Sequence, residues 1–399
     1  MKAAQKRKAI AAIDQWISRE RVCEILLDLV RIPSVNPPGG EGPVAAYLVQ
    51  RFKMLSLPAQ VTEVEPGRPN LVGTLPGRPG GKRLVFNTHL DVVPAGQGWS
   101  RDAFDPWVSE GKIYGRGSSD PKGSLAAMVH AIEAVHAAGV TIAGDVVLAG
   151  AMDEEVGSLG TRAMVGDLQA DMAVIGEPTG CQVCIAHKGS CRPVIVVGGR
   201  SAHAAEPEQG VNAITAAVPV LAALERYGRL LRRRRHRLLD SPTAAVTLIQ
   251  GGTKANMVPD GCEILVDRRL VSGETQDQVT VELNAIFSTL RTRHPELQVR
   301  IERFGPTTGG PSETDPTHPL VRAALKAVSR VRGGRARPHG FTLNCDMTIF
   351  RGHGVPTIIL GPGDPKMAHQ PDEFVPLDQL VASARIYAGL MVDSLGLAP

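Results

Sequence analysis

Aromatic residues are scarce in this chain, at 4% of 399 residues, and the charged residues nearly cancel to a formal net charge of +4. Nucleic-acid binding calls for a concentrated basic face, whereas here the basic residues are mostly scattered. No apolar run approaches the roughly 20 residues of a membrane-spanning helix. Six cysteines are too few for a disulfide scaffold in so long a chain. These shortages argue against nucleic-acid-binding, membrane and disulfide-rich classes.

The N-terminus also lacks the hydrophobic core of a secretory signal, so we expect a soluble, cytoplasmic protein. One basic cluster departs from the scattered pattern. Residues 232–237 read Arg-Arg-Arg-Arg-His-Arg and end a helical stretch. A solvated helix end is the favoured interpretation, because basic side chains stabilise a helix C-terminus, and an anionic partner is the alternative.

The first part of the chain alternates strand and helix patterns. Short apolar runs at Leu84–Phe86, Asp145–Ala151 and Met172–Ile175 indicate buried strands, and residues 122–138 have a helical period. Such runs predict a mostly parallel sheet flanked by helices. Ligands of these sheets bind beyond the carboxyl ends of the strands.

The pattern changes near residue 188. From residue 194 to residue 304 the predicted elements follow the order β-α-β-β-α-β, which is a split βαβ unit and a compact domain of its own. The α/β pattern then returns. The predicted fold is therefore α/β with two domains. The catalytic domain comprises residues 1–187 and 304–399, and the inserted domain comprises residues 188–303.

Five potential metal ligands are spread along the chain, and each lies just past an apolar run or opens a helix. They are His89, Asp120, Glu155, Glu177 and His369. Two further acids, Asp91 and Glu154, lie beside members of this set. Metal sites in enzymes gather imidazole and carboxylate groups from separate loops, and a pair of zinc ions needs about this inventory. One acid of such a cluster can bind metal while its neighbour acts as general base.

Each candidate also has a structural alternative. Asp120 precedes Pro121 and reads well as a helix N-cap followed by proline at the first helical position. The acids at 153–155 would also suit a solvated helix entrance. In an extended segment, residues two apart point the same way, so Asp91 could accept a hydrogen bond from the His89 ring nitrogen that does not face a metal.

A cysteine-rich segment is the other candidate for a metal. Its potential ligands are Cys181, Cys184, His187 and Cys191. The spacing is that of a zinc knuckle. However, residues 183–197 have an extended pattern, which would not fold tightly around an ion. Buried thiols are therefore the favoured interpretation.

Taken together, these residues resemble the di-zinc metallohydrolase family of acetylornithine deacetylase, succinyl-diaminopimelate desuccinylase, aminoacylases and glutamate carboxypeptidase. The resemblance covers nearly the whole chain, from Arg31 to Glu373. It is carried by His89-Leu90-Asp91, Gly115-Arg116-Gly117-Ser118-Ser119-Asp120, Asp153-Glu154-Glu155-Val156-Gly157, Gly176-Glu177-Pro178-Thr179 and the loop of His369.

The resemblance implies a site for two zinc ions per subunit. In it, Asp120 bridges the metals, His89 and Glu177 complete one site, and Glu155 and His369 complete the other. Carboxylate and imidazole ligands suit zinc, and cobalt or manganese could substitute. The family also tends to have a cis peptide after its bridging aspartate, so we predict a cis Asp120–Pro121 bond, which proline makes less costly.

The resemblance further implies the catalytic and substrate-binding groups. Glu154 would be the general base that activates a metal-bridging water for attack on an amide carbonyl. The inserted domain would cap the substrate and form a homodimer, in which His203 stabilises the oxyanion in the partner's active site. Asn256 and Arg269 would hold the substrate carboxylate, and a guanidinium is the best clamp for that group. The choice of Arg269 over Arg268 depends on the register of the alignment.

The predicted function is removal of an acyl group, such as acetyl or succinyl, from an N-acyl amino acid or related amide. The alternative is a zinc dipeptidase or carboxypeptidase with the same machinery, because both substrates place an amide near a free carboxylate. A catalytically silent metal-binding protein is disfavoured, since the proposed base and all five ligands occur together. The segment around Asp346 matches no single substrate subgroup, which leaves the acyl group and the amino acid open.

Overall fold

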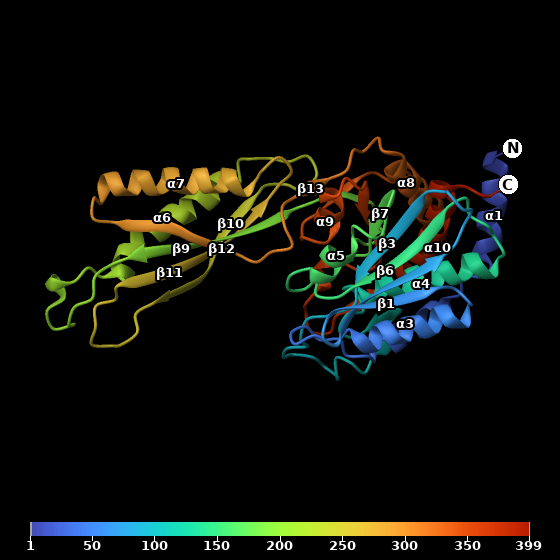
Figure 1. The fold of residues 1–399 in the computed structure, drawn as a ribbon, viewed down its shortest axis with the longest axis horizontal. Coiled ribbons are helices and arrows are strands. Elements are labelled where there is room, and N and C mark those ends of the chain that lie inside the picture. Colours follow the sequence, from blue (N-terminus) through green and yellow to red (C-terminus); the bar gives the residue numbers. More distant parts are fainter. Residues whose placement is uncertain (1, 399) are drawn as a thin grey trace. The chain divides into compact units, whose positions relative to one another are not determined.

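The computed structural model describes residues 2–398 and divides the chain into two compact units (Figure 1). The first unit contains the chain up to Ala186 and again from Glu313, and the second unit is His187–Ser312. The second unit is therefore inserted into the first. The boundaries placed from the sequence lie after residues 187 and 303. The later one falls inside the last strand of the second unit, which ends at Gly305.

The main sheet of the first unit has the strand order β1-β2-β6-β3-β7-β15-β8-β13, and β14 pairs with β8. Its strands are β1 (Ala59–Glu65), β2 (Arg68–Leu75), β3 (Arg83–His89), β6 (Asp145–Ala151), β7 (Met172–Ile175), β8 (Cys184–His187), β13 (Ser312–Glu313), β14 (His339–Phe341) and β15 (Thr357–Ile359). The central strands β6, β3, β7 and β15 are parallel to one another, whereas β2 runs antiparallel to β6 and β8 runs antiparallel to β15. Strands β3, β6 and β7 are almost wholly buried, as expected for apolar runs in a sheet covered on both faces. The predicted α/β class with a mostly parallel central sheet is confirmed.

Helices cover both faces of this sheet. The helices of this unit are α1 (Lys2–Asp14), α2 (Arg19–Val30), α3 (Gly42–Met54), α4 (Lys122–Ala137), α5 (Leu159–Met164), α8 (Pro319–Arg332), α9 (Met347–Gly352), α10 (Leu377–Leu395) and the short 3-10 helix η2 (Pro365–Met367). On one face Phe86 packs edge-on against Tyr387 of α10, with ring centroids 5.2 Å apart. On the other, Val85 shares a buried cluster with Met164 of α5 and Phe350 of α9. Neighbouring residues of β3 thus pack in opposite layers, which is the period of a strand.

A small antiparallel sheet lies in the same unit, in the order β16-β5-β4. Its strands are β4 (Trp107–Ser109), β5 (Lys112–Tyr114) and β16 (Phe374–Pro376). Strand β16 directly follows the His369 loop, and β5 directly precedes the segment that leads to Asp120. This pairing brings together two segments that are far apart in sequence.

The second unit has one antiparallel sheet, in the order β10-β11-β9-β12, with two helices. Its elements are β9 (Gly189–Gly198), η1 (Pro207–Gln209), α6 (Ala213–Leu231), β10 (Thr243–Gly251), β11 (Gly261–Leu270), α7 (Gln276–Arg293) and β12 (Gln298–Gly305). Both helices pack on one face of the sheet, where Leu224 and Phe287 join Ile264 in the core. The regular elements follow the order β-α-β-β-α-β that the sequence predicts. Within residues 2–398, no helix is long and apolar enough to cross a bilayer.

Candidate metal centre

Three of the five proposed ligands lie at the carboxyl edge of the parallel sheet. His89 is the last residue of β3, Glu155 follows the end of β6, and Glu177 follows the end of β7. Since these strands are parallel neighbours, their carboxyl ends meet at one edge. Asp120 lies just before α4, and His369 lies in the loop before β16. The structure therefore gathers ligands from five separate segments.

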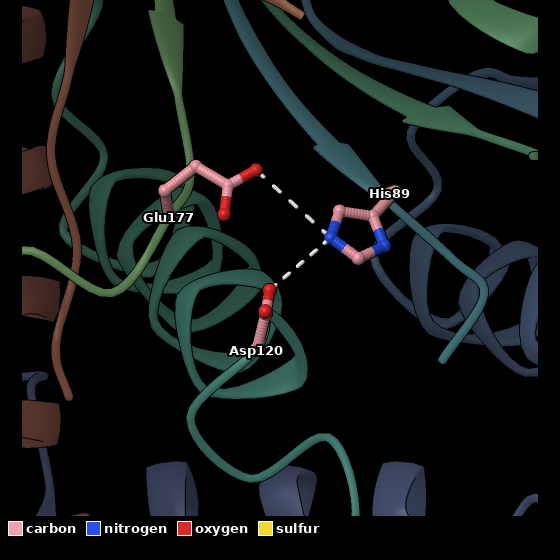
Figure 2. A group of neighbouring side chains, drawn as sticks. All are labelled: His89, Asp120 and Glu177. Carbon is pink, nitrogen blue, oxygen red and sulfur yellow. Dashed lines mark ion pairs between the residues drawn. The ribbon is translucent and has the colours of Figure 1, made fainter. Parts of the chain in front are cut away.

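The first ligand group consists of His89, Asp120 and Glu177, whose ligand atoms lie within 4.8 Å of one another (Figure 2). The His89 Nε2 atom is 3.3 Å from Asp120 Oδ1 and 3.9 Å from Glu177 Oε1. All three side chains are buried. One imidazole and two carboxylates at this spacing are a suitable donor set for a divalent transition metal.

The second ligand group consists of Asp120, Glu155 and His369, again within 4.8 Å. The His369 Nε2 atom is 3.1 Å from Glu155 Oε2 and 3.6 Å from Asp120 Oδ2. Asp120 thus directs Oδ1 towards one histidine and Oδ2 towards the other. A carboxylate arranged in this way can bridge two cations. This group is more open than the first, because the His369 side chain is 51% exposed.

Unsatisfied oxygens support a cation at these groups. Glu155 Oε1 is buried without a hydrogen-bond partner, and buried Asp120 Oδ1 has the ion-pair contact with His89 but no well-formed hydrogen bond. A buried acceptor without a partner is costly, and a bound cation would remove that cost. The donor set therefore fits metal ions held by these side chains.

The pKa shifts of the clustered side chains also favour bound cations. Burial alone would lower the pKa of His89, but Asp120, Asp91 and Glu154 outweigh it and hold the pKa well above its usual value. Burial raises the pKa of Glu177 far above its normal range, and the neighbouring Asp120 carboxylate adds to the rise. Carboxylates crowd together here, with protonated imidazoles as the balancing positive charge. Bound cations would take over that role.

Asp91 contacts the His89 ring with its backbone carbonyl as well as with its carboxylate. The His89 Nδ1 atom lies 2.9 Å from the Asp91 backbone carbonyl, whereas the Asp91 carboxylate is 3.4 Å away. That carboxylate also accepts hydrogen bonds from Asn36 and from the backbone N–H groups of Glu154 and Glu155. Either contact with His89 leaves Nε2 directed at the metal groups.

Glu154 belongs to neither ligand group, although it faces the same cluster. Its Oε2 atom lies 4.0 Å from His89 Nε2. Burial raises the pKa of Glu154 well above its usual range, and the nearby acids Asp346 and Glu177 raise it further against the opposing charge of His89. A buried carboxylate with a raised pKa, beside the metal ligands but outside their groups, has the properties of a general base.

Two structural alternatives from the sequence are wrong. The helix α4 begins at Lys122 with Pro121 in the capping position, and the Asp120 side chain caps nothing. Asp153 is 3% exposed, and the next helix begins only at Leu159, so the acids at 153–155 do not form a solvated helix entrance. The Asp120–Pro121 peptide bond is cis, as predicted.

Glu373 was not singled out from the sequence, yet its carboxylate holds the segment that carries Asp120. One oxygen accepts the backbone N–H groups of Ser119 and Asp120, each at 2.9 Å. The other accepts Gly117 N–H at 3.1 Å and the Arg116 guanidinium at 2.5 Å. Glu373 lies in the Gln-Pro-Asp-Glu motif after His369, but motif position alone does not reveal which backbone groups a carboxylate meets.

Asp346 is buried on the acidic side of the cluster. It is 1% exposed, and its Oδ2 atom accepts a hydrogen bond from Thr161 at 2.5 Å. Burial raises the pKa of this carboxyl. Asp346 therefore adds negative character next to Glu154 and Glu177, whose pKa values it raises.

The cysteine-rich segment forms no comparable group. Within residues 2–398, the sets of three or more metal-binding side chains close enough to share an ion are the two described above. Cys184 and His187 lie on strand β8, and Cys191 lies on β9. These cysteines are buried free thiols, as the extended pattern favours.

The remaining predicted site residues lie in the second unit. His203 and Asn256 are exposed neighbours, because Ala204 N–H donates to the Asn256 carbonyl at 3.0 Å and His203 pairs with Met257. Arg269 lies on the face of β11 away from the helices and pairs with Asp267, with Nε 2.7 Å from Oδ1.

Arg268, by contrast, is 1% exposed and bonded to Tyr227 and Glu274 under the helices. Of the two adjacent arginines, Arg269 is therefore the one that an incoming molecule can reach. This exposure favours the register that the sequence-based prediction uses.

The fold and the clustered ligands are those of a metal-dependent hydrolase, and comparison with known proteins agrees. The sequence model of the peptidase family M20/M25/M40 matches residues 85–393, so the chain belongs to this family of amide-bond hydrolases. Acetylornithine deacetylase of Proteus mirabilis (strain HI4320) is 30% identical over 338 residues, which cover 83% of this chain and 84% of that protein. The resemblance inferred from the motifs is confirmed.

Two solved structures have the same fold. The aminopeptidase PepT of Bacillus cereus ATCC 10987 matches with a TM-score of 0.75 at 22% identity, over 95% of this chain and 99% of that one. The YXEP protein of Bacillus subtilis, a dinuclear metal-binding peptidase of the M20 family, matches with a TM-score of 0.73 at 15% identity. That match covers 95% of this chain and 99% of the other.

Proposed function

We propose that this protein is a di-zinc amidohydrolase that removes an acyl group, such as acetyl or succinyl, from an N-acyl amino acid. The observation that carries the proposal is the pair of ligand groups that share Asp120, with one carboxylate oxygen directed at each histidine. Kinship with acetylornithine deacetylases supports the deacylase activity.

Two zinc ions would be held by the residues of these groups. One would bind His89 and Glu177, the other would bind Glu155 and His369, and Asp120 would lie between them. Zinc is the metal of choice for mixed imidazole and carboxylate donors, with cobalt or manganese as substitutes. When bound, the ions would polarise the scissile carbonyl and make water acidic enough to attack at neutral pH.

Glu154 would act first as general base and then as general acid. Its carboxylate takes a proton from the attacking water and later donates it to the nitrogen of the departing amine. Burial supports this role, because it raises the pKa of Glu154 towards that of a group able both to accept and to return a proton. Asp91 assists by holding the backbone of Glu154 and Glu155 through their N–H groups.

The second unit would supply the substrate-binding groups. The Nδ1 atom of His203 accepts the Ala205 N–H at 3.1 Å, which places the ring hydrogen of the neutral tautomer on Nε2. An Nε2–H group is a donor suited to an oxyanion. Asn256 and Arg269 would bind the substrate carboxylate, for which Arg269 would exchange its contact with Asp267.

The proposal includes a homodimer in which His203 serves the metal centre of the other subunit. Support comes from the edge strand β10, which has no neighbour on its outer side among the described residues 2–398. Leu248 and Ile249 on this strand are 63% and 49% exposed, and Val218 on the adjacent helix α6 is 61% exposed. An apolar edge strand of this kind is an aggregation hazard unless another chain covers it.

A substrate panel tests the function. The zinc-loaded protein is assayed with N-acetyl, N-succinyl and N-formyl amino acids and with dipeptides that have free carboxylates. Highest kcat/KM on an N-acyl amino acid supports the deacylase. Preference for dipeptides would support the alternative, a dipeptidase or carboxypeptidase, which the fold shared with the aminopeptidase also suits. Chelator-insensitive hydrolysis would contradict both.

A further inference from the structure

Behind the turn that carries Glu154 and Glu155 lies a set of buried charged side chains that the proposed mechanism does not use. Asp153 opens this turn with a φ of +67°, a left-handed conformation that non-glycine residues seldom adopt. Its backbone carbonyl accepts the N–H groups of Gly157, at 3.0 Å, and Ser158, at 2.5 Å, which closes the turn. Asp153 is 3% exposed, so its carboxylate needs a partner inside the protein.

One partner of the Asp153 carboxylate is the amide of Asn36. Its Nδ2 atom donates to Asp153 Oδ1 at 3.1 Å and to Asp91 Oδ2 at 2.8 Å. Asp91 in turn accepts the N–H groups of Glu154 and Glu155, each at 3.2 Å. The backbone N–H groups of Glu154 and Glu155 are therefore connected, through Asp91 and Asn36, to the carboxylate of Asp153.

The other partner is Arg68, from the start of strand β2. Its Nη2 atom lies 3.1 Å from Asp153 Oδ1. The same guanidinium forms a two-point contact with Glu41, with Nη2 2.7 Å from Oε1 and Nε 3.1 Å from Oε2. Glu41 is fully buried. A guanidinium held in this fork has a fixed orientation, which a single point charge would lack.

Packing confines Arg68 as well. The backbone of Gly39, with a φ of +102°, passes directly over the guanidinium, and a Cβ atom at Gly39 would be 2.0 Å from Arg68 Nε. Only glycine allows this approach in that conformation. Glu41 and Glu65 thus hold the Arg68 guanidinium, the latter with Oε2 2.9 Å from Nη1, and Gly39 confines it.

We propose that Arg68 is a positioning residue of the metal centre, which acts through Asp153 and Asn36 to hold the turn that presents Glu154 and Glu155. This role rests on the proposed function for its effect on catalysis, but its effect on the turn does not depend on that function. Arg68 touches no proposed ligand. It balances the negative charge of Asp153 and Glu41 and keeps the Asp153 carboxylate in the orientation that Asn36 shares with Asp91.

The central experiment compares Arg68→Gln with Arg68→Lys and with a matched control, Arg83→Gln. Arg83 begins the neighbouring strand β3 and pairs with Asp145 at 3.1 Å, away from the turn. Three quantities are measured: hydrogen exchange of the metal-free protein over residues 153–159, zinc affinity by competition with a chelating dye, and kcat and KM on the preferred amide.

For Arg68→Gln we expect amide exchange over residues 153–159 to accelerate at least about tenfold. One of the two zinc ions should bind about 10–100-fold more weakly, the usual effect of losing an outer partner of a metal ligand. The kcat should fall by a similar factor with KM nearly unchanged, because Glu154 is displaced while the groups of the second unit remain. Arg68→Lys should recover part of each loss, and Arg83→Gln should match the wild type.

A double-mutant cycle tests the route of the effect. If Arg68 acts through Asp153, the variant Arg68→Gln/Asp153→Asn should lose little more zinc affinity than either single variant. Additive losses would overturn that route. Wild-type exchange over residues 153–159 in Arg68→Gln would overturn the proposal itself, whatever the activity.

The exchange measurement also separates this inference from the proposed function. A wild-type protein that hydrolyses no amide would refute the function, and the exchange rates would still decide the role of Arg68. If Arg68→Gln does not fold, Gly39→Ala replaces it. That change displaces the guanidinium without removing a charge, and it should accelerate exchange over the same residues; unchanged exchange would refute the proposal.

Discussion

The shared position of Asp120 leads to a stoichiometric prediction about metal binding. The wild-type protein should bind two zinc ions tightly. His369→Ala removes a ligand from one group and Glu177→Gln removes a ligand from the other, so each variant should retain one tight site. Asp120→Asn should weaken both sites, because one carboxylate serves both histidines, at 3.3 Å and 3.6 Å.

The size of the effect follows from the ligand count. Each group offers three protein ligands, and the removal of one leaves two, fewer than the three that catalytic zinc sites normally have. Loss of an outer partner already costs about 10–100-fold in affinity, so the loss of a direct ligand should cost more than about 100-fold at that site.

Zinc titration of the metal-free protein against a competing dye, followed by metal analysis after gel filtration, provides the measurement. The exposed carboxylate of Glu24 offers a control, since Glu24→Gln should bind two ions like the wild type. If Asp120→Asn retained one site of wild-type affinity, Asp120 would belong to a single metal and the bridging arrangement would be wrong.

Three further predictions follow from single side chains. Glu154→Gln should lower kcat by about 10²–10⁴-fold, the range for loss of a general base, while both zinc ions stay bound; kinetics together with metal analysis check this, and full turnover would refute the role. Glu373→Gln should lower the free energy of unfolding by about 3–5 kcal/mol, because buried Arg116 loses its charged partner, and denaturant unfolding beside the Glu24→Gln control measures it. Burial lowers the pKa of His187 to about 4, so its neutral form stabilises the fold above pH 6.5 and that stability is lost as pH falls towards 4. Between pH 7 and pH 5 the wild type should lose about 2 kcal/mol more than His187→Leu in urea titrations, and equal losses would show that His187 is not the cause.

The sequence predicted the elements that carry the ligands better than the contacts around them. The run Met172–Ile175 matches β7 at both ends, because an apolar run bounded by turn residues is a local signal. The strand before the first histidine extends further than expected, and His89 is its last residue. A polar Asn-Thr-His ending does not look like a strand, but the ladder with β6 continues to His89 and the ladder with β7 continues to Asn87.

Local sequence patterns could not identify the residues that support the ligands. Asn36, Arg68 and Glu373 meet the site from segments 55 to 257 positions away from their partners, and none belongs to a periodic motif that reveals its direction. Asp120 illustrates the same limit. Its sequence suits a helix cap as well as a metal ligand, and only the three-dimensional positions of His89 and His369 distinguish the two roles.

The crowded acids around the two ligand groups have a consequence for how a substrate would be chosen. Two divalent cations would bring four positive charges, and six carboxylates lie in or beside the cluster: those of Asp91, Asp120, Glu154, Glu155, Glu177 and Asp346. The loaded centre would then have no excess of positive charge and would exert little net attraction on an anionic molecule. If the substrate has a free carboxylate, as proposed, cations outside the centre would have to bind it, and Arg269 is the candidate. Selectivity would accordingly reside in binding, and the cleavage machinery itself would be largely indifferent to which amide it receives.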